Sequence, residues 1–284
     1  MVATYGWDRW LSLVLAIAVS LSTLSSSAAS AAVLSASASD RSTAEQEPIV
    51  HPSFRAMIVG DSMSQGKDGQ YTWRYRFWQY LRSSVSVVTP QFVGPFNGTF
   101  LDDHNPNTVF HMKGKYAAGV DPEFLAGSCA HASAWGRPLS WSELTIAGWV
   151  KVHQPDWVLL MMGFNDLSWM GAAADELMEH FENDCPAPEL AKSVTREHLV
   201  NVTEQYNRRL IGNITRIEHK GEPSSMIKLV HLNRVYGCQP DYCPDGWDGL
   251  HPNEDGEWDI ARAFSIAMVE MGLTEKAIGN CLID

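Results

Sequence analysis

Residues 56–62 read AMIVGDS, an apolar run that ends in Gly60, Asp61 and Ser62. Such a run is typical of a short buried strand, and the glycine indicates a turn directly after it. Residues 156–163 read DWVLLMMG and follow Pro155. This second continuous apolar run is typical of a strand covered on both faces. Both segments therefore predict strands in the interior of a sheet.

Strand and helix patterns alternate through the rest of the chain. Further strands are predicted over 85–93 and 226–232, and helices over 71–83, 199–217 and 258–271. This alternation predicts an α/β fold, a three-layer α/β/α sandwich with a mostly parallel central sheet. Residues 94–135 are rich in Gly, Asn and His, and we expect them to be irregular and to have a functional role, because the segment is long for a simple connection.

The composition predicts a single domain and argues against binding to nucleic acid or to anionic lipid. The chain has 284 residues, of which 45% are hydrophobic, and this is enough for one sizeable core over residues 51–284. The formal net charge is -12. Binding to nucleic acid or to anionic lipid needs clustered Lys and Arg, so we expect neither partner, and we expect a monomer.

The N-terminal region has the pattern of an export signal. Arg9 precedes the apolar run LSLVLAIAVSLSTL at 11–24, and the small residues ASA follow at 29–31. We predict a signal peptide over 1–31, with a signal anchor as the alternative, and no stable membrane insertion of the mature chain. Residues 32–50 are rich in Ser and Ala and predict a disordered linker.

Five cysteines and three sequons also fit a secreted protein. Cys238 and Cys243 flank a four-residue loop, so we predict a local disulfide between them. A second pair, Cys129 with Cys185, would leave Cys281 over. The sequons Asn-x-Ser/Thr predict glycosylation sites at Asn97, Asn201 and Asn213.

Three short segments carry residues suited to nucleophilic catalysis. An alcohol becomes a good nucleophile when a base removes its proton and an acid orients that base. Ser62 follows a predicted strand, and His251 stands three residues after Asp248 in the loop DGLHP. Asn165 follows the second buried strand, where its amide could donate to an oxyanion. The structural alternatives are an ordinary turn for Ser62, a residue before Pro252 for His251, and a helix N-cap for Asn165.

The segments Gly60-Asp61-Ser62, 163–166 (GFND) and 248–252 (DGLHP) resemble conserved blocks of the SGNH hydrolases, also called the GDSL family. The resemblance covers roughly residues 56–272. It implies a flavodoxin-like SGNH hydrolase fold and no cofactor. It also implies that Ser62 is the nucleophile of an ester hydrolase, His251 the base and Asp248 the orienting acid. Met63 stands where the motif has Leu.

The resemblance further implies an oxyanion hole made by the Ser62 N–H, a glycine N–H and the Asn165 amide. Gly114, Gly119 and Gly136 compete for the glycine. We choose Gly136, because one predicted helix and one strand separate it from Asn165, as in the family, and Gly119 is the second choice.

The substrate prediction is finer and rests on fewer residues. Residues 72–78, 92–94 and 248–261 are similar to secreted family 3 carbohydrate esterases, which remove acetyl groups from plant polysaccharides. Trp135, Trp169 and Trp247 stand next to catalytic blocks and could stack on sugar rings, or they could pack the rim of the sheet. The alternatives are a lipid esterase or lysophospholipase with the same triad, and an inactive carbohydrate-binding protein.

A metal site is not expected. Residues 102–104 (Asp-Asp-His), His111 and His131 lie in the irregular segment, but their spacing matches no ligand pattern. Trp73 and Trp78, at helical spacing with other apolar residues, are expected in the core.

Overall fold

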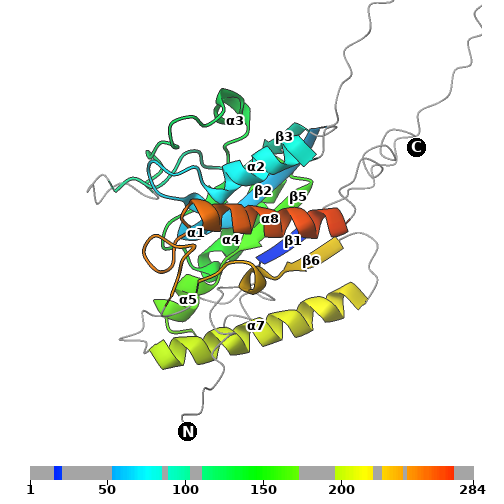
Figure 1. The fold of residues 1–284 in the computed structure, drawn as a ribbon. Coiled ribbons are helices and arrows are strands. Elements are labelled where there is room, and N and C mark those ends of the chain that lie inside the picture. Colours follow the sequence, from blue (N-terminus) through cyan, green and yellow to red (C-terminus); the bar gives the residue numbers. More distant parts are fainter. Residues whose placement is uncertain are drawn as a thin grey trace, which may run out of the picture.

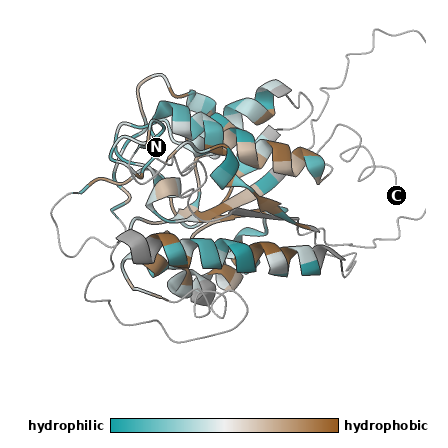
Figure 2. Cartoon of the chain, turned by 60° about the horizontal axis from the view of Figure 1, so that its bottom comes forward, coloured by the Kyte–Doolittle hydropathy of each residue, from teal (hydrophilic) through white to brown (hydrophobic). Residues whose placement is uncertain are grey.

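The computed structural model describes residues 16–20, 53–84, 89–102, 111–172, 196–219, 226–238 and 242–271. They form a six-stranded sheet with helices on both faces, which Figure 2 shows with the apolar sheet between two helical layers. The strand order is β3-β2-β5-β1-β6, and β4 pairs with β2. The strands are β1 (Ala16–Ser20), β2 (Ser53–Gly60), β3 (Thr89–Phe92), β4 (Ala132–Ser133), β5 (Trp157–Met161) and β6 (Met226–Val230).

Pairing within the sheet is mostly parallel. β2 pairs in parallel with β3, β4 and β5, whereas β1 is antiparallel to β5 and to β6. The predicted three-layer α/β/α sandwich is thereby confirmed. Because β2 and β5 lie side by side in parallel, Gly60 pairs with Met161 and the two strands end at the same edge of the sheet. Ligands of open α/β sheets bind just beyond such carboxyl ends.

Alternate residues of β2 face two separate hydrophobic cores. Ala56 and Ile58 face α2 (Trp73–Ser84) and α8 (Glu254–Glu270), which cover one face (Figure 1). Met57 and Val59 belong to the core of the other face, where α4 (Leu139–His153), α5 (Phe164–Ser168) and α7 (Arg196–His219) pack. This two-sided burial explains why β2 is apolar at successive positions.

The aromatic residues of α2 pack as predicted. Trp73 is fully buried and stacks on Phe264 of α8, with the ring centroids 4.7 Å apart. Trp78 is buried in the same core. The helices and strands begin and end within a few residues of the predicted ranges. The strand predicted over 85–93 is described from residue 89 onward, as β3, and residues 85–88 lie outside the described residues.

Two elements differ from expectation. The segment 94–135, expected to be irregular, contains α3 (Pro122–Gly127) and β4. Asp121 caps α3 by accepting from the Glu123 N–H at 2.8 Å, and Pro122 begins the helix, both of which are local helix-start signals.

The other difference is β1, which comes from the apolar run predicted as the core of a signal peptide. Its Ile17 lies opposite Leu160 of β5 and Leu229 of β6. Short apolar runs serve both purposes, because exported leaders and buried strands both require apolar residues. The strand belongs to the full-length chain, and removal of residues 1–31 stays a prediction. Residues 32–50 lie outside the described residues.

The cysteines and sequons can be placed in part. Cys238 and Cys243 form the predicted disulfide, and Cys129 has a free thiol, whereas Cys185 and Cys281 lie outside the described residues. Asn97 and Asn201 are exposed, and Asn213 is half-buried. In the part of the chain that the structure describes, no helix has both the length and the apolar character to span a bilayer.

Candidate active site

Ser62 begins the four-residue helix α1 (Ser62–Gln65) directly after β2. Asp61 caps this turn, because its Oδ1 accepts from the Met63 N–H at 3.0 Å. Gly60 is required for the turn, since a Cβ there would collide with the side chain of Ser64. The Ser62 N–H, in the first turn of the helix, has no hydrogen-bond partner among the described residues. The turn thus presents a hydroxyl and a free donor at the edge of the sheet.

Asp248 and His251 lie in the loop between η1 (Leu232–Arg234) and α8. The Nδ1 of His251 donates to Oδ2 of Asp248 at 2.7 Å. The other oxygen of Asp248 accepts from the backbone N–H groups of Leu250, at 3.1 Å, and His251, at 2.8 Å. The carboxylate therefore holds both the ring and the backbone of His251.

Burial raises the pKa of Asp248, but the hydrogen bonds from the His251 N–H and ring and from the Leu250 N–H outweigh it. The pKa of Asp248 therefore lies below its usual value. The carboxylate stays charged and can stabilise an imidazolium on His251.

The loop and the turn meet at a single hydrogen bond. The Ser62 hydroxyl lies 2.9 Å from Nε2 of His251, across 189 positions of the sequence. Because Nδ1 carries the proton shared with Asp248, Nε2 is free to accept the proton of Ser62. The structure thus brings together the three residues that the sequence predicts as acid, base and nucleophile.

The residues predicted to form the oxyanion hole line the same pocket as the Ser62 hydroxyl. Gly136 is exposed with φ +70°, and its N–H has no partner among the described residues. It lines the same pocket as Ser62, Asn165 and His251. Gly114 instead pairs with Thr99, away from this pocket. The structure therefore favours Gly136 for the backbone donor, and Gly119, the second choice, does not line the pocket.

The Asn165 amide is held by two acceptors. Its Nδ2 donates to Oδ2 of Asp61 at 3.2 Å and to the carbonyl of Arg137 at 3.1 Å. Burial, with the nearby charge of Asp166, raises the pKa of Asp61 to about 7, although the Met63 N–H acts in the opposite direction. Asp61 thus orients the amide as well as the turn that carries Ser62.

Two supporting residues were not predicted in these roles. Gln65, at the end of α1, accepts from the Trp135 N–H at 2.6 Å and so ties the Gly136 loop to the nucleophile turn. Asp166 accepts from the Leu139 N–H at 2.7 Å and so caps α4 rather than its own helix. The N-cap residue of α5 is Gly163, which provides no side-chain cap. The sequence shows that Asp166 is an acidic residue beside a helix start. Its partner Leu139 lies 27 positions away, so the sequence does not indicate which helix it caps.

Comparisons with known proteins agree with this geometry. Residues 57–264 match the family described as GDSL-like Lipase/Acylhydrolase. The match spans most of the chain and includes Ser62, Asn165, Asp248 and His251. The chain belongs to the GDSL-like lipase/acylhydrolase family. This acylhydrolase is therefore an ester-bond hydrolase.

The solved structures to which the chain is similar are distant from it in sequence. A family 3 carbohydrate esterase of Clostridium thermocellum is 19% identical with a TM-score of 0.50, covering 78% of this chain and 97% of the other. One from Talaromyces cellulolyticus is 17% identical with a TM-score of 0.48, covering 77% and 97%. A mutant acetyl esterase with acetate ion is 18% identical with a TM-score of 0.47 and the same coverage. No curated protein matches the chain.

The catalytic pocket of this acylhydrolase has a volume of about 230 Å³. Besides the catalytic and oxyanion residues, it is lined by Trp135, Phe164, Trp169 and Leu250. Four apolar side chains around a few polar groups are typical of a site for a small organic substrate.

The three tryptophans predicted beside the site take different positions. Trp135 stacks on Phe100 and on His251, with both centroid distances 4.4 Å. Trp247 also lies nearly parallel to the His251 ring, at 5.4 Å. Trp169 is 63% exposed at the pocket. Trp135 and Trp247 therefore pack against the base, and Trp169 alone presents its ring mainly to solvent.

The expectation that the chain holds no metal site concerns residues that the structure describes only in part. Within the described ranges, no group of three His, Cys, Asp or Glu side chains is arranged to hold a metal ion. His131 is buried, with Nε2 3.0 Å from the Gly98 carbonyl, and Asp103 and His104 lie outside the described residues.

Proposed function

We propose that this protein is a secreted serine esterase that removes acetyl groups from a carbohydrate. The observation that carries the proposal is the hydrogen-bonded chain from Ser62 through His251 to Asp248, which opens into a small pocket beside the exposed Trp169. A small pocket suits a short acyl group, and an exposed indole suits the face of a sugar ring.

In the first half of the reaction, Oγ of Ser62 attacks the ester carbonyl while Nε2 of His251 takes its proton. The negative oxygen that forms is held by the N–H groups of Ser62 and Gly136 and by the Asn165 amide, once one of its two N–H groups turns from its present acceptor, Asp61 or the Arg137 carbonyl, towards the oxyanion. His251 then gives its proton to the leaving sugar oxygen, and an acetyl group stays on Ser62.

In the second half, water attacks this acetyl-enzyme. His251 takes a proton from the water, and the same three donors hold the second oxyanion. When the bond to Oγ breaks, the proton returns to Ser62 and acetate leaves. Asp248 keeps its charge throughout and stabilises the imidazolium.

Support for a carbohydrate substrate comes from Trp169 and from the shared fold. The exposed ring lies at the pocket, where it can stack on the sugar whose ester is cleaved. The Clostridium thermocellum neighbour with the same fold is described as a carbohydrate esterase. Export is supported by the N-terminal sequence, the Cys238–Cys243 disulfide and the sequons.

A fluorophosphonate probe tests whether Ser62 is an activated nucleophile. The folded protein is expected to be labelled at Ser62, and Ser62→Ala is expected to lose labelling and nearly all esterase activity, by about 10⁴-fold or more. A folded wild-type protein that is not labelled would point to the inactive carbohydrate-binding alternative.

Acetate release from acetylated xylan tests the substrate. We expect release by the wild type, and we expect Trp169→Ala to raise KM for the polymer by about tenfold relative to its effect on an aryl acetate, since stacking contributes about 1 kcal/mol or more. Cleavage of lysophospholipid in preference to acetylated xylan would favour the lipid esterase alternative.

A further inference from the structure

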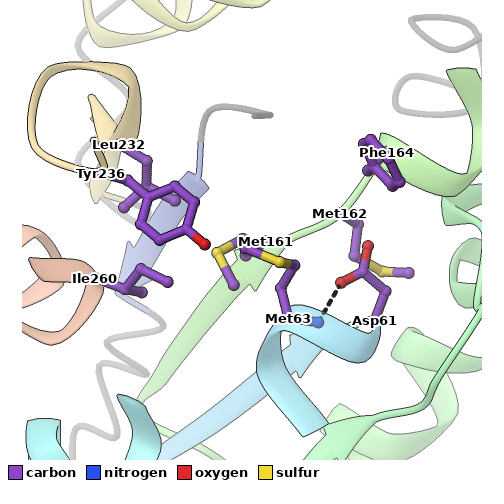
Figure 3. A pocket seen from close by; sticks show the side chains of 8 residues that line it. All are labelled: Asp61, Met63, Met161, Met162, Phe164, Leu232, Tyr236 and Ile260. Atoms are coloured by element: carbon purple, nitrogen blue, oxygen red, sulfur yellow. Dashed lines mark hydrogen bonds between the residues drawn. The ribbon is translucent and has the colours of Figure 1, made fainter. Parts of the chain in front are cut away.

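Phe164 separates the catalytic pocket from a second, smaller hollow. The side chain lines both spaces, so it lies between them. The nucleophile turn divides in the same way, because Ser62 lines the catalytic pocket while Asp61 and Met63 line the second hollow. We call this second hollow the methionine recess. Figure 3 shows Phe164 with Met162 and Asp61 on one side of it.

The methionine recess is apolar and small. Its volume is about 10 Å³, which is room for about one water molecule. The lining is mainly apolar, and includes Met63, Met161, Met162, Leu232 and Ile260.

The two polar side chains at the recess are engaged elsewhere. The Tyr236 hydroxyl donates to the carbonyl of Leu250 at 2.6 Å, and the Asp61 carboxyl accepts from Met63 and Asn165. The space itself therefore offers surface suited to an aliphatic chain, and the two residues on either side of Ser62, Asp61 and Met63, line it.

The backbone explains why Phe164 stands at this boundary. Gly163, with φ +113°, turns the chain out of β5, and Phe164 is the first residue of α5. The next residue is the oxyanion donor Asn165, which fixes this turn against Asp61. Phe164 is only partly buried, so its ring closes the pocket without forming the centre of either core.

We infer that Phe164 closes the acyl end of the catalytic pocket and so restricts this esterase to short acyl groups. The inference rests on the proposed function, since it explains why an acetyl group would be preferred. Loss of the ring joins the pocket to the methionine recess. Methionines are unbranched and flexible, so Met63, Met161 and Met162 can move apart to admit an acyl chain.

The size of the effect follows from burial of methylenes. Each methylene that leaves water favours binding about fourfold, and butyrate has two more than acetate. We therefore expect Phe164→Ala to raise the ratio of kcat/KM for an aryl butyrate to that for an aryl acetate by up to about 15-fold. Phe164→Leu, which leaves a smaller apolar wall, should give a smaller rise in the same direction.

The test measures kcat/KM for aryl acetate, butyrate and hexanoate with the full chain. Ile260→Val is the matched control, because it enlarges the methionine recess from its far side and leaves the Phe164 wall intact. Its ratio should stay within about twofold of the wild type. Circular dichroism and fluorophosphonate labelling show that each variant is folded with a competent serine, and Phe164→Leu provides the test if Phe164→Ala does not fold.

The outcomes for the two proposals are separate. If folded Phe164 variants keep the wild-type ratio, the inference about Phe164 is wrong, whichever ester the wild type prefers. If the wild type itself prefers hexanoate to acetate, the proposed deacetylase function is wrong. A wild type that prefers acetate, with a ratio that rises in Phe164→Ala and not in Ile260→Val, supports both.

Discussion

Asp248 illustrates how one carboxylate can do two things for a base. It fixes the tautomer of His251 through Nδ1 and the backbone through two N–H groups. We predict that Asp248→Asn lowers kcat by about 10³- to 10⁴-fold with little change in KM, because the amide no longer favours the required tautomer. Steady-state kinetics on an aryl acetate checks this. A loss below tenfold would mean that another group orients His251.

Asp61 gives the fold a dependence on pH. Its pKa is about 7 in the folded chain and near 4 when unfolded, so the folded state binds the proton more tightly. This carboxyl therefore lowers the free energy of unfolding as pH rises from about 4 to 7, and its full penalty applies above pH 7.

We predict that Asp61→Asn, relative to the wild type, gains stability between pH 5 and pH 8 by up to about 2 kcal/mol. Urea unfolding at the two pH values measures the difference. Asp255→Asn, at an exposed carboxyl, is the control. A difference between Asp61→Asn and wild type that does not change with pH would contradict the assignment.

At the scale of elements, the loop that carries the base contains the Cys238–Cys243 disulfide, which lies on the N-terminal side of Asp248 and His251. The bridge spans a sequence separation of five, for which chain entropy predicts a contribution of about 2 kcal/mol. We predict that the wild type loses about this much stability in reductant, whereas the double variant Cys238→Ser/Cys243→Ser does not respond.

Cys129→Ser is the matched control for the disulfide. Its thiol is free, so this variant should keep the wild-type response to reductant. Melting curves with and without dithiothreitol provide the measurement. Equal melting temperatures for the wild type in both buffers would show that the bridge adds nothing to stability.

The position of β1 in the sheet leads to a prediction about the chain after removal of residues 1–31. β5 and β6 are both antiparallel to β1 and so run parallel to each other, with Leu160 and Leu229 opposite the same residue. If export removes residues 1–31, the backbone groups that paired with β1 lose their partners, and buried unpaired groups cost about 1–3 kcal/mol each. We expect β5 and β6 to pair directly.

Hydrogen exchange on a chain that starts at residue 32 tests this closure. Protected amides in both strands are expected if the gap closes. Rapid exchange in β5 and β6, or a truncated chain that does not fold, would indicate that β1 is a permanent part of the sheet.

The sequence was most informative about features that depend on residues close together in the chain. Ser62, Asp248 and His251 stand in short motifs whose chemistry depends on neighbours within a few residues. The hydrogen bond from Asn165 to Asp61 and the cap from Asp166 to α4 join residues 104 and 27 positions apart. Such contacts depend on which strands pair and in what register, and that information is spread over the whole sheet. β1 was not predicted because its composition also fits a leader.

At the scale of the whole molecule, the exposed sequons test export. Asn97 and Asn201 are exposed, whereas Asn213 is half-buried and accepts from Arg216 at 2.6 Å. We predict that protein secreted from a glycosylating host carries glycans at Asn97 and Asn201 more often than at Asn213. Peptide mass spectrometry before and after glycosidase treatment measures occupancy. Secreted protein without glycans at all three sites would contradict the sequon assignments.

The acid and the base of this enzyme are attached to the same short piece of chain, and Asp248 binds the backbone of the residue whose ring it orients. A shift of that loop would therefore carry both groups together and leave their 2.7 Å contact intact. Within the triad, the contact that would change is the 2.9 Å one between Ser62 and His251. The reactivity of Ser62 would then depend on this one distance. A movement of the loop would lower the activity of the enzyme while the hydrogen bond between Asp248 and His251 stays intact, and activity would return with the loop.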